Sequence, residues 1–210
     1  VKTSDGRINW IMDFSMLIDS KGMADFDKIS ARFRAALTNV WGNRLENDGF
    51  NRLVLMGGLT GREASILRAY AKYMRQIGVT FSQSYIESTF ANYPNIAAQI
   101  VNLFAKKFSV KSPASAKTLE KLSTQIYLEL ENVANLDDDR IIRLYVDMIA
   151  ATLRTNYFQK DDAGQFKSYV SFKIQPSLIP DVPLPLPAFE IFVYSPRVEG
   201  VHLRYGKVAR

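Results

Sequence analysis

The stretch TGREASILRAYAKYMRQIG, residues 60–78, constrains the fold of this chain more than any other segment. Thr60 and Glu63 stand at the spacing of a capping box, and Gly78 is a residue type at which helices commonly end. The apolar residues between them form two seams at helical spacing, so only a narrow polar stripe remains. The pattern therefore predicts a helix that is buried over most of its surface. The seams are Ala64, Leu67, Ala71 and Met74, and Ile66, Tyr70, Tyr73 and Ile77; the stripe is Ser65, Arg68, Lys72, Arg75 and Gln76.

Helical periodicity also marks the segments before and after this helix. Several of them begin with residues that favour a helix start, such as Ser or a proline in the first turn. Helices are therefore expected to fill most of the stretch from about 60 to 153. The other expected helices run from about Phe26 to Trp41, after Ser82, from Pro94, from about Ala116, and from the acidic Asp137, Asp138 and Asp139 to near Arg154.

The sequence changes from helical periodicity to alternation near residue 154. RTNYFQ, YVSFKIQ, FEIFVYS and GVHLRY each predict a strand, with DDAGQ as the turn between the first two. Residues 176–187, PSLIPDVPLPLP, cannot form a central strand or a helix, because proline fixes φ and lacks a donor. A further strand is expected in residues 7–18, RINWIMDFSMLI. The predicted fold class is α+β, a predominantly helical block followed by a small antiparallel or mixed sheet.

The composition excludes several classes of site and partner. Cysteine is absent, which rules out disulfides and thiolate metal sites in this segment and suits a reducing, cytoplasmic location. No apolar run approaches the ~20 residues that cross a bilayer, so no membrane association is expected. The net charge is +6, but the basic residues are interspersed with acidic ones and form no run, so no nucleic-acid partner is expected either.

Two loops allow a functional and a structural interpretation. GGLTGRE around Gly57 could cradle an anion before a helix, yet it matches neither phosphate-loop pattern, and a loop with a capping box explains it. The run Asp137–Asp139 could bind a cation, but carboxylates at the start of a helix also complement the helix dipole. We expect the structural interpretation in both places.

Three further features are open to similar alternatives. Arg68, Lys72 and Arg75 share a helical face and could bind an anion or a neighbouring carboxylate, although a solvated or salt-bridged stripe is expected. His202 is the only histidine, and without acidic neighbours at metal spacing it is expected to be structural. Pro180 and Pro183 match PxxP, a common motif read by SH3-type grooves, although its flanks here are apolar.

The chain ends on VHLRYGKVAR, residues 201–210, an expected strand followed by a basic turn. Gly206 permits the turn, and Lys207 and Arg210 place two cations at its edge. These cations are suited to a carboxylate, which Arg binds in bidentate fashion and Lys as a point charge. Because the chain also lacks an initial Met, we expect it to be a segment of a longer protein.

Three long stretches resemble the large bacterial NAD-specific glutamate dehydrogenases. They are ENDGFNRLVLMGGLTGREASILRAYAKYMRQIG, SYIESTFANYPNIAAQIVNLFAKKF and PAFEIFVYSPRVEGVHLRYGKVAR, and the resemblance covers essentially all 210 residues. Those enzymes are very long chains in which a regulatory N-terminal half, including ACT-like domains, precedes the catalytic region. The resemblance implies an internal segment that joins the two.

The resemblance also gives the basic turn a role. In the family, the sequence after a KVAR-like turn continues with Gly-Gly-Leu-Arg-Trp. Smaller glutamate dehydrogenases carry Lys-Gly-Gly-Leu/Ile-Arg at a similar place, where the Lys helps to hold the side-chain carboxylate of the substrate. By that match Arg210 takes the position of the Lys and is an expected substrate-binding residue, although Arg differs from Lys in reach and geometry. Lys207 lies on the same turn and is the second expected substrate-binding residue, without a family residue that it matches.

The implied reaction of the parent enzyme is oxidation of L-glutamate to 2-oxoglutarate and ammonia, with NAD as the cofactor. The family's catalytic Lys and Asp and its dinucleotide-binding fold lie beyond residue 210, so the segment is expected to hold no catalytic residue, NAD or metal and to be inactive alone. The expected divisions are 1–56 as the end of an ACT-like strand–helix unit, 57–154 as a helical block and 155–210 as the start of the substrate domain. The parent is expected to be a cytoplasmic homo-oligomer.

A second hypothesis belongs to a different functional class. The early strand–helix unit and the helices could form a non-catalytic regulatory or scaffolding module that binds an amino-acid effector or another subunit. Saturable binding of free amino acids would favour this alternative.

Overall fold

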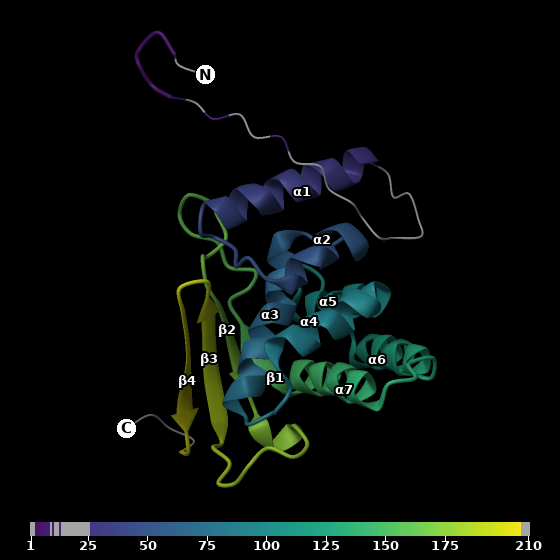
Figure 1. The fold of residues 1–210 in the computed structure, drawn as a ribbon. Helices are drawn as coiled ribbons and strands as arrows, with labels where there is room; N and C mark the ends of the chain where they lie inside the picture. Colours follow the sequence, from purple (N-terminus) through teal and green to yellow (C-terminus); the bar gives the residue numbers. More distant parts are fainter. Residues whose placement is uncertain (1–2, 9, 11–12, 14–25, 207–210) are drawn as a thin grey trace.

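The computed structural model describes residues 3–8, 10, 13 and 26–206, in which helices pack against one face of a small sheet (Figure 1). The strand predicted in residues 7–18 falls mostly outside these residues. The elements are α1 (Phe26–Trp41), η1 (Gly49–Asn51), α2 (Arg52–Met56), α3 (Gly61–Gln76), α4 (Gln83–Asn92), α5 (Pro94–Phe108), α6 (Ala116–Leu130), α7 (Leu136–Ala151), β1 (Thr152–Thr155), β2 (Val170–Ile174), η2 (Pro176–Leu178), β3 (Phe189–Ser195) and β4 (Val198–Arg204).

The central helix α3 has the ends that its sequence predicts. The Thr60 hydroxyl accepts from the Glu63 amide at 3.2 Å, and the Glu63 carboxylate accepts from the Thr60 amide at 2.8 Å, which completes the capping box. At the other end Gly78 has φ +83° and its amide donates to the Arg75 carbonyl. The next amide reaches back to the Met74 carbonyl, so the helix closes in a Schellman motif.

The predicted starts of the later helices are also confirmed. Ser82 caps α4 and Ser115 caps α6 through their side chains, and Pro94 lies in the first turn of α5. The cap of α7 is Asn135, whose side chain accepts from the amides of the following residues at 2.8 and 3.2 Å. Asp137–Asp139 therefore occupy the first turn, where their charge complements the helix dipole.

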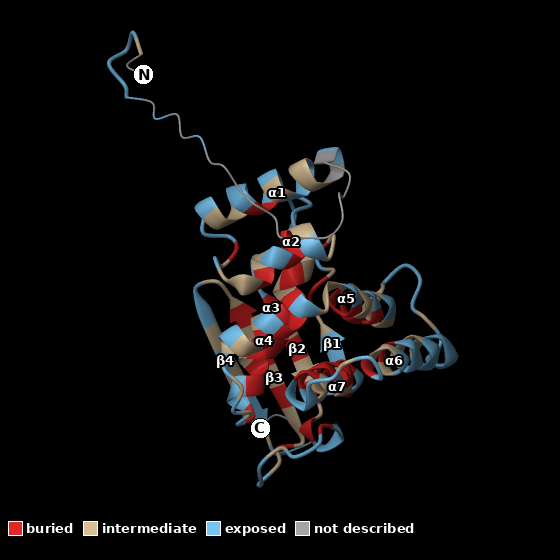
Figure 2. Cartoon of the chain, turned by 45° about the vertical axis from the view of Figure 1, so that its right-hand side comes forward, coloured by how far each residue is buried: buried red, intermediate tan, exposed pale blue. Residues whose placement is uncertain are grey.

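The strands form an antiparallel meander in the order β1-β2-β3-β4, so the α+β prediction is confirmed and its antiparallel form is the observed one. Alternate side chains of β2 and β3 point towards α3. Phe172 lies opposite Phe192 across the strand pair, and the Tyr70 ring stacks on Phe172 with centroids 4.4 Å apart. These residues belong to one continuous core that joins helices and sheet, which Figure 2 shows as buried residues along α3 and the strands facing it.

Three details differ from the sequence-based prediction. Arg68, assigned to the polar stripe of α3, has no exposed surface, because the segment before α3 covers it. That segment contains η1 and α2, which are too short to show a helical periodicity in the sequence. The last helix ends at Ala151 and the first strand begins at Thr152, because Thr152 already pairs with Ile174 of β2.

The Pro-rich stretch 176–187 forms one short 3₁₀ turn at Pro176–Leu178 and otherwise contains no helix or strand. It passes close to the C-terminal end of α3, where a Cβ added to Gly78 would lie 3.5 Å from Pro183 Cγ. The prediction of an irregular connection is therefore confirmed apart from that turn.

Lys107 is expected to make a contribution to stability that grows as the pH rises from about 8 towards 10.5. Its Nζ donates to the carbonyls of Ile149 and Ala150 at 2.8 and 2.7 Å, and burial lowers its pKa from 10.5 to about 8. Between these values the Lys107 side chain binds more protons in the unfolded chain than in the folded chain, so its contribution to the free energy of unfolding rises with pH. The half-exposed position reduces the expected contribution to about 1–2 kcal/mol.

Urea denaturation at about pH 7 and pH 10 measures this gain against the Lys107→Arg variant, whose guanidinium stays charged throughout. The free energy of unfolding of wild type relative to the variant is expected to increase between the two pH values. Equal changes of stability with pH in the two proteins would contradict the role of Lys107.

Candidate functional site

The two cations predicted to bind substrate, Lys207 and Arg210, fall outside the described residues. The structure describes the strand that leads to them and the chain as far as Gly206. Among the described strands β4 pairs with β3 alone, with Arg204 opposite Phe189 at its end. The surroundings of this end of β4 are therefore the candidate functional site.

The face of the sheet that points away from the helices carries Arg and Lys side chains beside an apolar one. Arg154 lies opposite Lys173, Lys173 opposite Ile191, and Ile191 opposite His202, so the four share one face. The Nζ of Lys173 lies 4.0 Å from the ring centroid of Phe189. In Figure 1 the helices lie on the other side of the sheet. The outer face thus offers positive charge beside apolar surface, a combination suited to a carboxylate on a carbon chain.

The inner face at the same end contains a buried carboxylate. Glu190 of β3 is 6% exposed, and its carboxylate accepts a hydrogen bond of 2.6 Å from the Tyr73 hydroxyl. Burial raises the pKa of Tyr73, and the neighbouring Glu190 charge raises it further, so the tyrosine keeps its proton and donates it. Glu190 and Tyr205 both line a hollow of about 240 Å³ under the end of β4.

This pair was not predicted from the sequence, although a signal was present. Glu190, Phe192 and Tyr194 alternate in β3, so a charged residue shares a face with two aromatic ones. An ionisable side chain at an inward position of a strand needs a buried partner.

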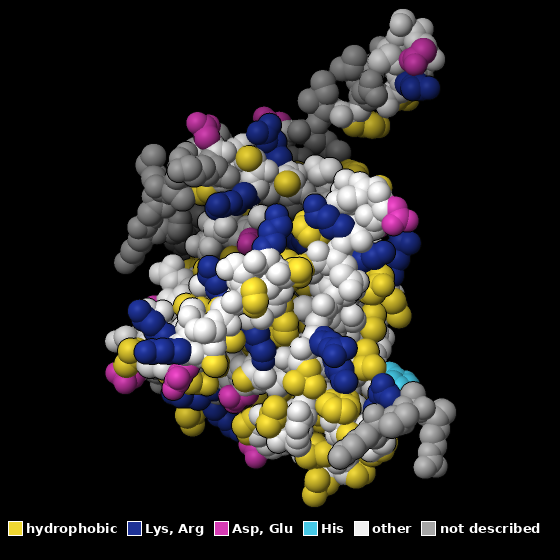
Figure 3. Space-filling view, turned by 180° about the vertical axis from the view of Figure 1, so that it is seen from behind, with side chains coloured by type: hydrophobic (Ala, Val, Ile, Leu, Met, Phe, Trp, Pro, Cys, Tyr) yellow, Lys and Arg dark blue, Asp and Glu magenta, His cyan; other side chains and the backbone are white. Residues whose placement is uncertain are grey.

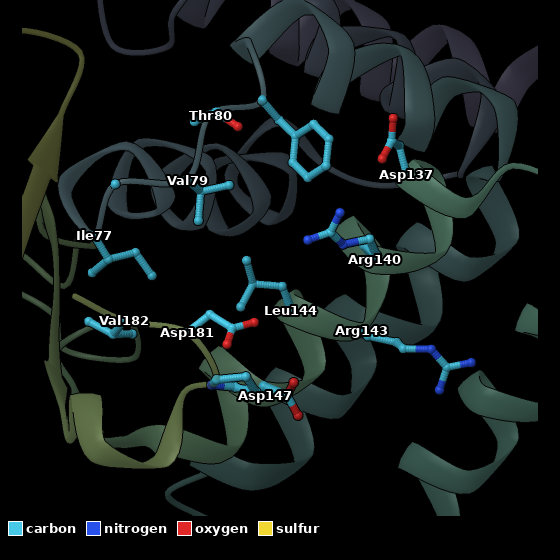
Figure 4. Close-up of a pocket in the computed structure, with 13 residues that line it drawn as sticks. Ile77, Val79, Thr80, Asp137, Arg140, Arg143, Leu144, Asp147, Asp181 and Val182 are labelled. Carbon is cyan, nitrogen blue, oxygen red and sulfur yellow. The ribbon is translucent and has the colours of Figure 1, made fainter.

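A second hollow, of about 560 Å³, lies beside the first between the end of α3, α7 and the Pro-rich stretch. The two hollows share Ile77, Gly78 and Val182 as a common wall. Figure 4 shows Arg140 reaching into the second hollow from α7, with Asp181 on the opposite wall, while Arg143 points away.

The charges of this second hollow are mixed. Arg143 is bound to Asp139 by two hydrogen bonds of 2.8 and 2.9 Å, so its charge is neutralised within α7. Burial raises the pKa of Asp147, and the nearby Arg143 opposes that rise. With Arg140 and Asp181, the hollow presents both signs of charge, as a zwitterionic ligand requires.

Three of the basic residues on α3 bind carboxylates of the chain. Arg68 pairs with Asp48, Lys72 with Glu46 at 3.4 Å, and Arg75 with Glu199. The expected salt-bridged stripe is therefore the observed arrangement, with neighbouring carboxylates of the chain as the partners.

The remaining candidates do not form a metal site within the described part of the chain. His202 is exposed on the outer face, and no group of three or more His, Asp and Glu that could hold a metal occurs among the described residues. Asp138 is buried and accepts from the Thr89 hydroxyl at 2.7 Å, a structural contact between helices. The GGLTGRE segment forms the loop and capping box before α3.

Two surface properties bear on possible partners. Seen from behind, Lys and Arg are interspersed with hydrophobic and neutral side chains and form no continuous basic tract on that face (Figure 3). Within the part of the chain that the structure describes, none of the helices has both the length and the apolar character needed to cross a membrane.

Comparison with protein families identifies two regions. Residues 125–210 match the family described as "Bacterial NAD-glutamate dehydrogenase, catalytic domain", and residues 45–110 match "Glutamate dehydrogenase, helical motif 3". The first region contains α7 and the whole sheet, and the second contains η1 and α2 to α5.

Individual proteins give the same result over the full chain. NAD-specific glutamate dehydrogenases from Pseudomonas aeruginosa, Halomonas elongata and Mycobacterium tuberculosis are 44%, 41% and 40% identical over all of this chain. The chain spans 13% of the length of each of these relatives.

Proposed function

The chain belongs to the large NAD-specific glutamate dehydrogenases, and from this membership we propose that it forms part of the substrate domain of such an enzyme. The longer protein, here called the parent enzyme, would oxidise L-glutamate to 2-oxoglutarate and ammonia and reduce NAD. The observation that carries the proposal is the match of residues 125–210 to a catalytic domain, because these residues contain the sheet and the basic turn. The cationic outer face of the sheet supports it, since glutamate carries two carboxylates.

NAD itself does not fit the described residues. A dinucleotide is normally bound by a parallel strand–helix–strand unit with a glycine-rich turn before the helix. The described sheet is an antiparallel meander without such a unit, so we assign the cofactor to another part of the parent enzyme. The segment alone would hold no NAD and catalyse nothing.

The internal divisions of the segment are part of the proposal. Residues 1–56 would end an ACT-like unit, residues 57–154 would brace the substrate domain against the regulatory half, and residues 155–210 would begin the substrate domain. The shared core of helices and sheet supports a bracing role, because the helical block cannot move without the sheet. We also propose that the parent enzyme is a homo-oligomer. A cytoplasmic location is proposed as well, in keeping with the absence of cysteine from this segment.

The sharpest test on the substrate side replaces Arg210 in the full-length parent enzyme. Arg210→Ala is expected to raise KM for L-glutamate roughly tenfold or more with a smaller change in kcat, because one charge-assisted contact to a substrate carboxylate is lost. Arg210→Lys, which restores the residue type of the smaller enzymes, is expected to recover part of that loss. Lys207→Ala is expected to change KM in the same direction.

Steady-state kinetics with glutamate as the varied substrate provide the measurement. Arg197→Ala is the control, because Arg197 is exposed at the turn between β3 and β4, at the far end of the strand. A KM in Arg210→Ala equal to that of the control would remove Arg210 from the substrate site.

A second candidate function rests on the mixed charges of the 560 Å³ hollow. Arg140 and Asp181 on opposite walls would suit the carboxylate and ammonium groups of a free amino acid, as a regulatory module requires. Calorimetric titration with free amino acids tests this alternative: saturable binding that Arg140→Gln abolishes would favour it, and no heat of binding would exclude it.

A further inference from the structure

A third hollow lies at the opposite end of α3 from the candidate site. It has a volume of about 640 Å³, within the range of small-molecule sites. Its walls come from the end of α1 and the loop after it, the first turns of α3, the connection between β1 and β2, and the turn between β3 and β4. Segments distant in the sequence therefore meet there.

The charges of this hollow all have one sign. Arg44, Arg62 and Lys167 line it, and no Asp or Glu is among its lining residues. The N-terminus of the 16-residue helix α3 adds the positive end of the helix dipole. The Glu63 carboxylate is bound to Thr60 in the capping box and does not line the hollow.

Arg62 shows that this positive charge is not neutralised within the described chain. Its guanidinium donates to the backbone carbonyls of Tyr157 and Lys167, and it makes no ion pair with a described carboxylate. The rings of Tyr157 and Phe166 lie 4.4 and 4.1 Å from its central carbon. Burial lowers the pKa of Arg62, as expected for a charge removed from water without a counter-ion. A half-buried guanidinium that its neighbours hold in place favours the binding of an anion from solution.

A buried nitrogen of Arg62 points to the same conclusion. Arg62 lines the hollow, and its Nε is buried without a hydrogen-bond partner among the described residues. Buried N–H donors usually have a partner, so an unpartnered one in the wall of a cavity indicates a missing acceptor.

We propose that this hollow binds a small anion with two or more negative charges, a dicarboxylate or a phosphate, held by Arg62 with Arg44 and Lys167. The binding site goes beyond the proposed substrate role, because it lies at the other end of α3 and shares no lining residue with the two hollows near β4. A ligand there would join α1, α3 and the β1–β2 connection.

Isothermal titration calorimetry of the 210-residue protein tests the site with succinate, inorganic phosphate and acetate at low salt. Saturable binding of succinate or phosphate, with acetate at least tenfold weaker, is the expected result, and the stronger of the two identifies the ligand class. Added salt is expected to weaken binding, because the contacts are charged. Absence of binding by both divalent anions would overturn the proposal.

Variants locate the binding within the hollow. The double variant Arg44→Gln/Lys167→Gln changes side chains whose head groups make no ion pair with described carboxylates, so it is expected to fold and to weaken binding tenfold or more. Arg62→Gln is expected to abolish binding; because it also removes contacts to two carbonyls, its stability is measured alongside. Lys117→Gln, on the exposed first turn of α6, removes a charge elsewhere and should leave affinity within about twofold. A double variant that binds as wild type does would place the anion elsewhere and refute the site.

Discussion

Replacing Arg68 by Met is expected to lower the free energy of unfolding by about 3–5 kcal/mol. Arg68 lies in the middle of α3, and its guanidinium donates to both carboxylate oxygens of Asp48 at 2.5 and 2.6 Å and to Asn51 at 3.0 Å. The Asp48 side chain is only 10% exposed. Met restores much of the apolar volume but leaves Asp48 as a nearly buried charge without a cation, which is the costly half of a broken pair.

Urea denaturation measures the loss as a lower midpoint with an unchanged slope. Arg75→Gln is the matched control on the same helix, because the Arg75 pair with Glu199 is exposed and is expected to contribute less than about 1 kcal/mol. Adding Asp48→Asn to Arg68→Met removes the orphan charge and should recover part of the stability. A loss below about 1 kcal/mol for Arg68→Met would show that the network does not hold the η1–α2 segment to α3.

Replacing Tyr73 by Phe is expected to cost about 2–3 kcal/mol, although it removes a single oxygen atom. The Tyr73 hydroxyl is the hydrogen-bond donor to Glu190, and both residues are buried between α3 and β3. Without it the buried carboxylate has no hydrogen-bond partner among the described side chains. A buried polar group that loses its partner costs its full desolvation penalty, which lowers stability.

Thermal or urea unfolding of three variants, each compared with wild type, separates this effect from the loss of a surface hydroxyl. Tyr85→Phe is the control, because its hydroxyl makes only a 3.4 Å contact with Asn135 at the surface, and a change within about 0.5 kcal/mol is expected. Glu190→Gln in the Tyr73→Phe background replaces the orphan charge by a neutral amide and should restore part of the loss. If Tyr73→Phe and Tyr85→Phe cost the same, Glu190 does not depend on Tyr73.

The helices were predictable because their ends are encoded locally. Thr60, Ser82 and Ser115 each accept from an amide within one turn, and Pro94 fixes φ in the first turn of α5. Gly78 supplies the left-handed conformation that closes α3. Such signals need no knowledge of tertiary contacts. The alternation in β2, β3 and β4 is equally local, and it placed these strands to within two residues.

What could not be predicted depends on contacts between distant segments. The burial of Arg68 follows from Asp48, twenty residues earlier, and the pairing of Glu190 with Tyr73 spans 117 residues. Likewise, Thr152 starts a strand because Ile174 pairs with it. The hollow around Arg62 requires four segments to meet, and no spacing within one of them indicates it.

We propose that this chain is part of an enzyme that oxidises glutamate with NAD. The most direct measurement is the rate of NADH formation by the full-length parent enzyme with L-glutamate and NAD, beside the 210-residue chain under the same conditions. The parent is expected to form NADH and ammonia, and the isolated chain is expected to form neither. A parent enzyme that reduces no NAD with glutamate, or an isolated chain that does so alone, would contradict the account.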